Sequence, residues 1–285
     1  MVPGMAGPAK VWRHRTGEIV LDRTRVMGVL NVTPDSFSDG GQFYDADAAV
    51  RHGLEMVEHG ADLLDIGGES TRPRSDPVPA DEEWRRVGGV IESLRRKVDV
   101  PLSIDTMKPA VAEKAVHAGA SIVNDVSGMR EPAMIRLVAS LKAGVVVMHM
   151  LGNPKTMQEH PQYADVVGEV RGFLADRIAA LEAAGTSSDA IAIDPGIGFG
   201  KTLEHNLALL RGLDGLAALG HPVVVGVSRK SFIAKLGAGE GGERVPGSLA
   251  AAAFAVSRGA SVVRAHDVLE TVRAMRVADA LVRPS

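Results

Sequence analysis

The segment Val26-Met-Gly-Val-Leu-Asn31 shows the unit from which most of this chain is built. Its apolar residues follow one another without polar alternation, which is typical of parallel strands that are covered on both faces. From residue 25 onward the same order recurs: a short apolar run, a polar or glycine-rich stretch, and a segment with apolar residues three and four apart. The runs predict strands at residues 26–30, 63–66, 102–104, 121–123, 145–148, 190–193, 223–225 and 261–263.

Eight strands that alternate with helical segments, such as 46–59, 81–97 and 165–184, predict an α/β fold, the (β/α)₈ TIM barrel. Two short alternating pieces, 10–14 and 18–22, flank Thr16-Gly17 and predict an N-terminal β-hairpin that plugs the bottom of the barrel. An open doubly wound sheet is the alternative, but the eight units follow one another without a linker or a change in composition. We therefore expect a flexible tail at residues 1–10 and a single domain at residues 11–285.

Composition narrows the possible partners. The 285 residues include 32 Lys or Arg and 35 Asp or Glu, a formal net charge of −3, which argues against nucleic-acid binding because proteins that bind phosphate backbones normally carry a basic excess. No apolar run reaches the roughly 18 residues of a membrane helix, so no membrane partner is expected. The absence of Cys excludes thiolate metal sites and thiol nucleophiles, and it fits a cytoplasmic location.

Polar side chains follow all eight predicted strands, at the end of the barrel where reacting groups project. They include Asn31, Asp65, Asp105, Asn124, His149, Asp194, Ser228, Lys230, Arg264 and His266. Any one Asp, Asn or Ser here could be a helix N-cap, but capping does not call for Lys230, Arg264 and His266. The carboxylates and amide suit the donor-rich edge of a flat heterocycle, whereas the cations with Asn31 suit a phosphate or diphosphate and its Mg²⁺.

Two motifs match other catalytic patterns only in part. Three residues separate Gly196 from Gly200, whereas a P-loop requires four between its outer glycines. The run Gly226-Val-Ser-Arg-Lys230 ends in Lys where a nucleophile elbow has Gly. A Schiff base on Lys230 is chemically possible on this fold, but the surrounding cations favour a binding role for this side chain.

Seven motifs carry the strand ends and the loops after them. They are Gly28-Val-Leu-Asn-Val-Thr-Pro-Asp-Ser-Phe-Ser-Asp-Gly40, Asp65-Ile-Gly-Gly-Glu-Ser-Thr-Arg-Pro73, Ser103-Ile-Asp-Thr106, Asn124-Asp-Val-Ser-Gly128, Asp194-Pro-Gly-Ile-Gly-Phe-Gly-Lys201, Ser228-Arg-Lys-Ser231 and Arg264-Ala-His266. Together they closely resemble the dihydropteroate synthase family of folate biosynthesis. The resemblance implies a (β/α)₈ barrel and a transferase, EC 2.5.1.15. Such an enzyme condenses 6-hydroxymethyl-7,8-dihydropterin diphosphate with 4-aminobenzoate to give 7,8-dihydropteroate and diphosphate.

The resemblance also implies residue roles. The pterin would be bound by Asp105, Asn124, Met148, Asp194, Phe199 and Lys230. The diphosphate would be bound by Asn31, Thr71, Arg264 and His266, and Asn31 would also touch Mg²⁺. The 4-aminobenzoate pocket would consist of Phe37, Thr71, Arg72, Pro73, Ser228 and Ser231. The catalytic set would be Lys230, Arg264, His266 and Asn31.

The implied reaction begins with departure of diphosphate from the pterin methylene, followed by attack of the arylamine. A single amide oxygen is a poor magnesium ligand, so we expect Mg²⁺ to arrive with the diphosphate. Sulfonamides are expected to compete with 4-aminobenzoate, and the family suggests a homodimer formed through the last helices. Two alternatives remain: a pterin-dependent methyltransferase, which has no use for a diphosphate site, and a non-catalytic barrel that serves as a partner subunit.

Overall fold

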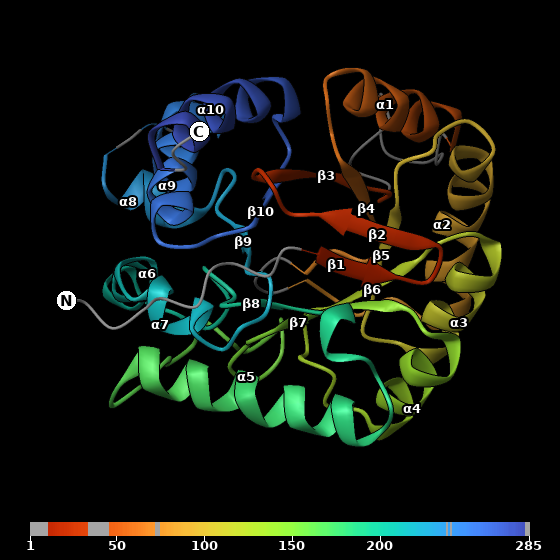
Figure 1. Ribbon diagram of the computed structural model, residues 1–285, viewed down its shortest axis with the longest axis horizontal. Coiled ribbons are helices and arrows are strands. Elements are labelled where there is room, and N and C mark those ends of the chain that lie inside the picture. Colours follow the sequence, from red (N-terminus) through yellow and green to blue (C-terminus); the bar gives the residue numbers. More distant parts are fainter. Residues whose placement is uncertain (1–10, 34–45, 72–74, 238, 240, 283–285) are drawn as a thin grey trace.

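The computed structural model describes residues 11–33, 46–71, 75–237, 239 and 241–282, and it contains a parallel barrel (Figure 1). Its strands are β3 (Arg25–Asn31), β4 (Leu63–Gly67), β5 (Leu102–Asp105), β6 (Ile122–Asp125), β7 (Gly144–Met148), β8 (Ile191–Asp194), β9 (Val224–Gly226) and β10 (Val262–Ala265). The hydrogen-bonded order is β8-β7-β6-β5-β4-β3-β10-β9, and a parallel bridge between Ile193 and Val223 closes the ring. The predicted barrel is confirmed, with each strand within two residues of its expected bounds.

Helices cover the outside of this sheet (Figure 1). They are α1 (Ala46–Glu58), α2 (Ala80–Arg95), α3 (Pro109–Ala118), α4 (Pro132–Leu141), α5 (Val166–Ala183), α6 (Leu203–Arg211), α7 (Leu213–Ala217), α8 (Ser231–Lys235), α9 (Val245–Ser257) and α10 (Val268–Val282), with 3₁₀ turns at Ser188–Ala190 and Gly241–Arg244. Local chemistry fixes several starts: α3 and α4 begin with Pro, whose missing N–H costs nothing there, and Thr202 with His205 forms a reciprocal cap on α6.

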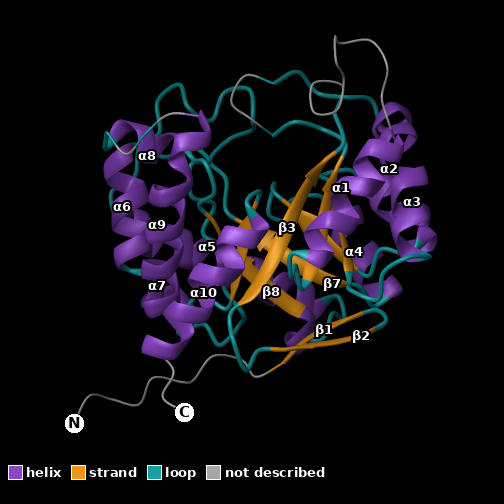
Figure 2. Ribbon diagram, turned by 90° about the horizontal axis from the view of Figure 1, so that it is seen from above, coloured by secondary structure: helices purple, strands orange, loops and turns teal. Residues whose placement is uncertain are grey.

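The N-terminal hairpin, β1 (Val11–His14) with β2 (Gly17–Val20), closes one end of the barrel (Figure 2). Trp12 and Ile19 are buried against the inward-facing side chains of the strands, among them Met27 and Val146. The Trp12 indole Nε1 donates to the Ala190 carbonyl at 3.1 Å, so this large ring is buried without an unpaired donor. The predicted plug is confirmed. The division into a tail and one domain stays a prediction, and residues 1–10 lie outside the described residues.

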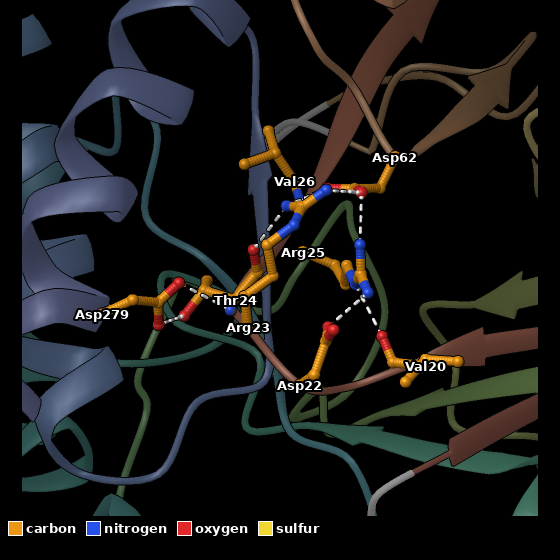
Figure 3. Close-up of polar contacts among 8 residues, drawn as sticks. All are labelled: Val20, Asp22, Arg23, Thr24, Arg25, Val26, Asp62 and Asp279. Carbon is orange, nitrogen blue, oxygen red and sulfur yellow. Dashed lines mark hydrogen bonds and ion pairs between the residues drawn. The ribbon is translucent and has the colours of Figure 1, made fainter. Parts of the chain in front are cut away.

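Charged side chains secure the same end, which we call the bottom (Figure 3). The Asp62 carboxylate accepts from Arg23 Nη1 at 3.0 Å, from Arg25 Nη1 at 3.0 Å and from the Val26 amide at 2.9 Å. Asp279 on α10 accepts from the amide and the hydroxyl of Thr24 at 2.8 and 2.7 Å. The last helix is thereby fastened to the start of β3, at the opposite end from the polar strand ends.

Candidate active site

The C-terminal ends of the strands, which we call the top, hold a buried cluster around one guanidinium. Arg264 on β10 donates from Nε to Asp65 Oδ2 at 2.7 Å and from Nη2 to Asp105 Oδ2 at 2.8 Å. Asp65 Oδ2 also accepts from Asn124 Nδ2 at 2.9 Å. Asp65 thus orients both a predicted pterin residue and a predicted diphosphate residue. The sequence placed Asp65 at a strand end but did not assign it a role, because its partners come from β6 and β10.

Charge is only partly compensated in this cluster. Burial raises the pKa of Asp105 to about 7, against the opposing effect of Arg264, and the neighbouring Asp65 raises it further. The second carboxylate oxygens, Oδ1 of Asp65 and Oδ1 of Asp105, are buried and find no hydrogen-bond donor among the described residues. Buried carboxylate oxygens normally have donors, so the top retains acceptor capacity that the fold itself does not use.

Beside this cluster lies a pocket that most of the predicted pterin residues share. It is lined by Asn124, Val126, Met148, Asp194, Gly196, Ile197, Phe199, Gly226, Lys230 and Arg264. Five of the six residues predicted for the pterin line it, and the sixth, Asp105, contacts the pocket residue Arg264. Asp194 Oδ1 accepts from the Gly196 amide at 2.7 Å, which leaves the rest of the carboxylate as an acceptor toward the pocket.

Lys230 combines an aromatic contact with a perturbed charge. Its Nζ lies 4.1 Å from the centroid of the Phe199 ring, a cation–π arrangement. Burial lowers the pKa of Lys230 to about 8, with Arg264 lowering it and Asp194 and Asp105 raising it. The residue before it, Arg229, has φ 55° and pairs with Asp267, which ties the loop after β9 to the loop after β10.

His266 differs from expectation in its charge. Its Nδ1 lies 3.0 Å from Ser228 Oγ, which also accepts from the His266 amide at 3.2 Å. Burial, followed by Arg264 and Arg229, lowers the pKa of His266 to about 3. The sequence suggested a positive charge here, but the imidazole is neutral at pH 7 in this site because it is desolvated beside fixed cations. It therefore serves as a hydrogen-bonding group.

The loop after β4 is anchored at its base by three charged residues. Lys108 Nζ contacts the carboxylates of Glu69 and of Glu83, the latter fully buried on α2. Glu69 Oε1 also accepts from the Val78 amide at 3.1 Å, so one side chain joins both ends of the loop. The sequence gave no sign of this network, because its members lie on three elements that only the barrel brings together.

The remaining predicted residues fall into two groups. Asn31 ends β3, Thr71 lies on the loop after β4, and Ser231 is the first residue of α8, as expected; none of them is among the described residues that line the pocket. Phe37, Arg72 and Pro73 lie outside the described residues.

Comparisons with known proteins decide the family. A family model for pterin-binding enzymes matches residues 27–266. The dihydropteroate synthase of Escherichia coli strain K12 is 46% identical over 260 residues, which cover 91% of this chain and 92% of that protein. The chain belongs to the dihydropteroate synthase family.

Solved dihydropteroate synthases have the same fold. The Xanthomonas albilineans enzyme with 4-aminobenzoic acid is 48% identical, with a TM-score of 0.91, and the match covers 97% of this chain and all (100%) of that one. The Yersinia pestis enzyme with a sulfonamide drug is 44% identical, with a TM-score of 0.90, and the match covers 95% of this chain and 98% of that one. No helix among the described residues is long and apolar enough to cross a membrane.

Dihydropteroate synthases generally depend on Mg²⁺, and the top of the barrel fits a metal held mainly by substrate. The described residues contain no group of three or more His, Asp or Glu side chains that could hold a cation. Arg264 engages Oδ2 of Asp65 and of Asp105, and the Asn31 amide adds a hard oxygen at the end of β3. One amide oxygen suits a cation whose other ligands are diphosphate and water.

Proposed function

We propose that the top of this barrel condenses 6-hydroxymethyl-7,8-dihydropterin diphosphate with 4-aminobenzoate to give 7,8-dihydropteroate and diphosphate. The observation that carries the proposal is the pocket that brings Asn124, Asp194, Lys230 and Arg264 together from β6, β8, the loop after β9, and β10. Acceptors for a pterin edge and a guanidinium for a diphosphate thus lie beside one another, as the two halves of this substrate require.

The pterin is recognised through complementary hydrogen bonds. The Asp194 carboxylate accepts from the 2-amino group and N3 of the ring, a bidentate arrangement that fixes its orientation. Burial raises the pKa of Asp194, and the Gly196 amide, Lys230 and Arg264 oppose that rise. Asn124 is held by Asp65 and presents its amide to the ring. Met148 and Phe199 line the slot as apolar walls, and Lys230, held against the Phe199 ring, lies where it can donate to the heterocycle.

Departure of diphosphate is the step that the cations assist. Arg264 has five N–H donors, of which Asp65 and Asp105 take two, so the others remain for leaving-group oxygens. The neutral His266 imidazole donates a hydrogen bond to the same group. Mg²⁺, when bound with the diphosphate and touched by Asn31, supplies further neutralisation of the leaving charge. Such electrostatic stabilisation contributes several kcal/mol.

The arylamine attacks the pterin methylene after diphosphate has begun to leave. Its nitrogen is already neutral at pH 7, so no strong general base is required, and catalysis rests on positioning and on the leaving group. In this proposal the 4-aminobenzoate pocket consists of Phe37, Thr71, Arg72, Pro73, Ser228 and Ser231. Sulfonamides occupy the same pocket and compete; the relative from Yersinia pestis, solved with a sulfonamide drug, supports this part.

The chain forms a homodimer through its last helices in this proposal, and it is cytoplasmic. Exposed apolar side chains support the dimer: Phe254 on α9 and Val277 and Leu281 on α10 are 40%, 62% and 82% exposed. Side chains of this size left in water on neighbouring helices are typical of a contact surface.

Product analysis tests the proposed activity. The purified chain with both substrates and Mg²⁺ should yield 7,8-dihydropteroate, identified by mass, with omission of either substrate as the control. Methyl transfer from methyltetrahydrofolate to a corrinoid would favour the methyltransferase alternative instead. Absence of both products from a folded protein that still binds pterin would favour the partner-subunit alternative.

A further inference from the structure

Lys201 is a buried lysine that the proposed reaction does not use. It follows Gly200 at the end of the loop after β8, and the residue is 3% exposed. Its Nζ lies 3.0 Å from His149 Nδ1 and donates to the carbonyls of His149 at 3.3 Å and Phe199 at 3.0 Å. Three acceptors match the three donors of an ammonium group, and no carboxylate of the described residues pairs with it.

The contacts of Lys201 join two loops that both contribute to the pterin pocket. His149 follows β7 directly after the pocket residue Met148, and its amide donates to the Asp194 carbonyl at 3.0 Å. Phe199 belongs to the loop after β8, and its amide donates to the Gly196 carbonyl at 3.0 Å. The Lys201 amine therefore spans the end of β7 and the turn that carries Phe199.

The two loops approach so closely that backbone alone fits between them. A Cβ on Gly196, which has φ +67°, would lie 1.9 Å from the His149 carbonyl oxygen. Aromatic rings complete the enclosure: Phe173 meets the His149 ring edge-on at 5.0 Å between centroids, and the Tyr163 hydroxyl donates to the Gly200 carbonyl at 2.9 Å. Because His149 is hydrogen-bonded to Asp194 and Lys201 bridges His149 and Phe199, a displacement of the loop after β7 would disturb Asp194 and Phe199 together.

We propose that Lys201 is a positioning residue for pterin binding: its amine fixes the Phe199 turn against the end of β7 and so sets the width of the pterin slot. The inference rests on the proposed function for the identity of the ligand. It extends that function by assigning a role to a residue that is not among the described residues lining the pocket and that acts on it through Phe199 and the end of β7.

Charge strengthens the arrangement. Burial lowers the pKa of Lys201 to about 7. Burial also lowers the pKa of His149 to about 3, and the nearby charges of Lys201 and Arg130 contribute to that shift. His149 is thus a neutral acceptor for the amine. Asp194 raises the pKa of Lys201, and Lys201 in turn opposes the rise in the pKa of Asp194 that burial causes.

Calorimetric binding of 6-hydroxymethylpterin, a ring without diphosphate, tests the proposal without turnover. Lys201→Met keeps an unbranched apolar stem that ends at the Cε position but removes the amine and its three donors. We expect its pterin dissociation constant to rise about tenfold or more, and the KM for 4-aminobenzoate to change by less than about twofold. Lys97→Met, at an exposed lysine after α2, is the matched control and should bind pterin as the unmodified chain does.

A purely structural role would lower the melting temperature of Lys201→Met but leave the pterin affinity of the folded protein unchanged, and that result would overturn the proposal. An equal rise of both KM values would overturn it as well. If Lys201→Met does not fold, His149→Asn, which retains an acceptor near the Nδ1 position, and His149→Leu, which removes it, replace it. Weaker pterin binding by the Leu variant supports the proposal, and equal binding contradicts it. Dihydropteroate formation by the unmodified chain is measured separately, so failure of the function and failure of the positioning role are distinguishable.

Discussion

The two ends of the barrel use charged residues in opposite ways. At the bottom, both oxygens of Asp62 and both of Asp279 have donors from neighbouring elements. At the top, Asp65 and Asp105 each have one buried oxygen for which the described part of the chain supplies no donor, and the Lys230 ammonium rests on an aromatic ring. Complete pairing stabilises the fold, whereas incomplete pairing keeps groups ready for a ligand at a cost in stability. The difference separates a structural face from a functional one within a single barrel.

The largest expected effect is a loss of turnover when Lys230, a cation of the top that serves both substrates, is removed. Lys230→Ala is expected to lower turnover more than tenfold, because it removes a cation that lines the pterin pocket and lies near the proposed site for 4-aminobenzoate. Steady-state rates at saturating substrate measure this, with Lys235→Ala, at an exposed lysine on α8, as control. Survival of more than about a tenth of the rate would mean that the role of Lys230 is wrong.

Asp194→Asn should separate the two substrates. The amide keeps the shape of the side chain but loses one of the two acceptors that the pterin donors need, so pterin affinity should fall about tenfold or more. The affinity for 4-aminobenzoate should change far less. Calorimetric titration of the variant with 6-hydroxymethylpterin and, separately, with 4-aminobenzoate in the presence of diphosphate gives both affinities. Equal losses would overturn the assignment of Asp194 to the pterin.

At the bottom the expected loss is in stability alone. Asp62→Ala removes one acceptor from each of Arg23 and Arg25 and the side-chain acceptor of the Val26 amide, which should lower the free energy of unfolding by about 2 kcal/mol with kcat/KM unchanged. Asp22→Ala is the matched control: Asp22 pairs with the same Arg25 but is 69% exposed, so the loss should stay below about 1 kcal/mol. A bottom-face variant with intact stability and reduced activity would break the comparison.

The last effect concerns the pH dependence of stability. The pKa of His266 is about 3 in the folded chain and near 6.5 when unfolded, so the unfolded state takes up a proton first and stability falls as pH drops below 6.5. His266→Asn, whose amide can replace the contact with Ser228, removes this contribution. Urea unfolding at pH 7 and pH 5 should show a shallower loss for the variant, by at most about 1.4 kcal/mol per pH unit. Identical slopes would mean that His266 titrates normally.

Sequence patterns were informative where function depends on position along a strand. The apolar runs predicted all eight strands, and the alternating pieces around Thr16-Gly17 predicted the hairpin. The residues that follow the strands predicted that Asn124, Asp194, Lys230 and Arg264 would converge. The pairings across the barrel were not predictable, because they depend on which side chains fill the space between strands. Asp65 bridges Asn124 and Arg264, and Lys201 joins two loops, through contacts between residues 52 to 199 positions apart.

The charge of His266 was missed for a related reason. A sequence shows that an imidazole follows a strand, but its protonation depends on burial and on the distance to Arg264 and Arg229, which only the packed structure fixes. The anchoring of Glu69 by Lys108 likewise needs the fold. The roles of Phe37, Arg72 and Pro73 stay predictions, since these residues lie outside the described part of the chain.

Diphosphate release tests the central claim most directly. The purified chain is mixed with 6-hydroxymethyl-7,8-dihydropterin diphosphate and Mg²⁺, and released diphosphate is measured with and without 4-aminobenzoate. The account predicts sustained release that requires 4-aminobenzoate and matches dihydropteroate formation one for one. Tight binding of the pterin diphosphate with no release on adding 4-aminobenzoate would contradict it and leave a pterin-binding barrel that does not catalyse this condensation.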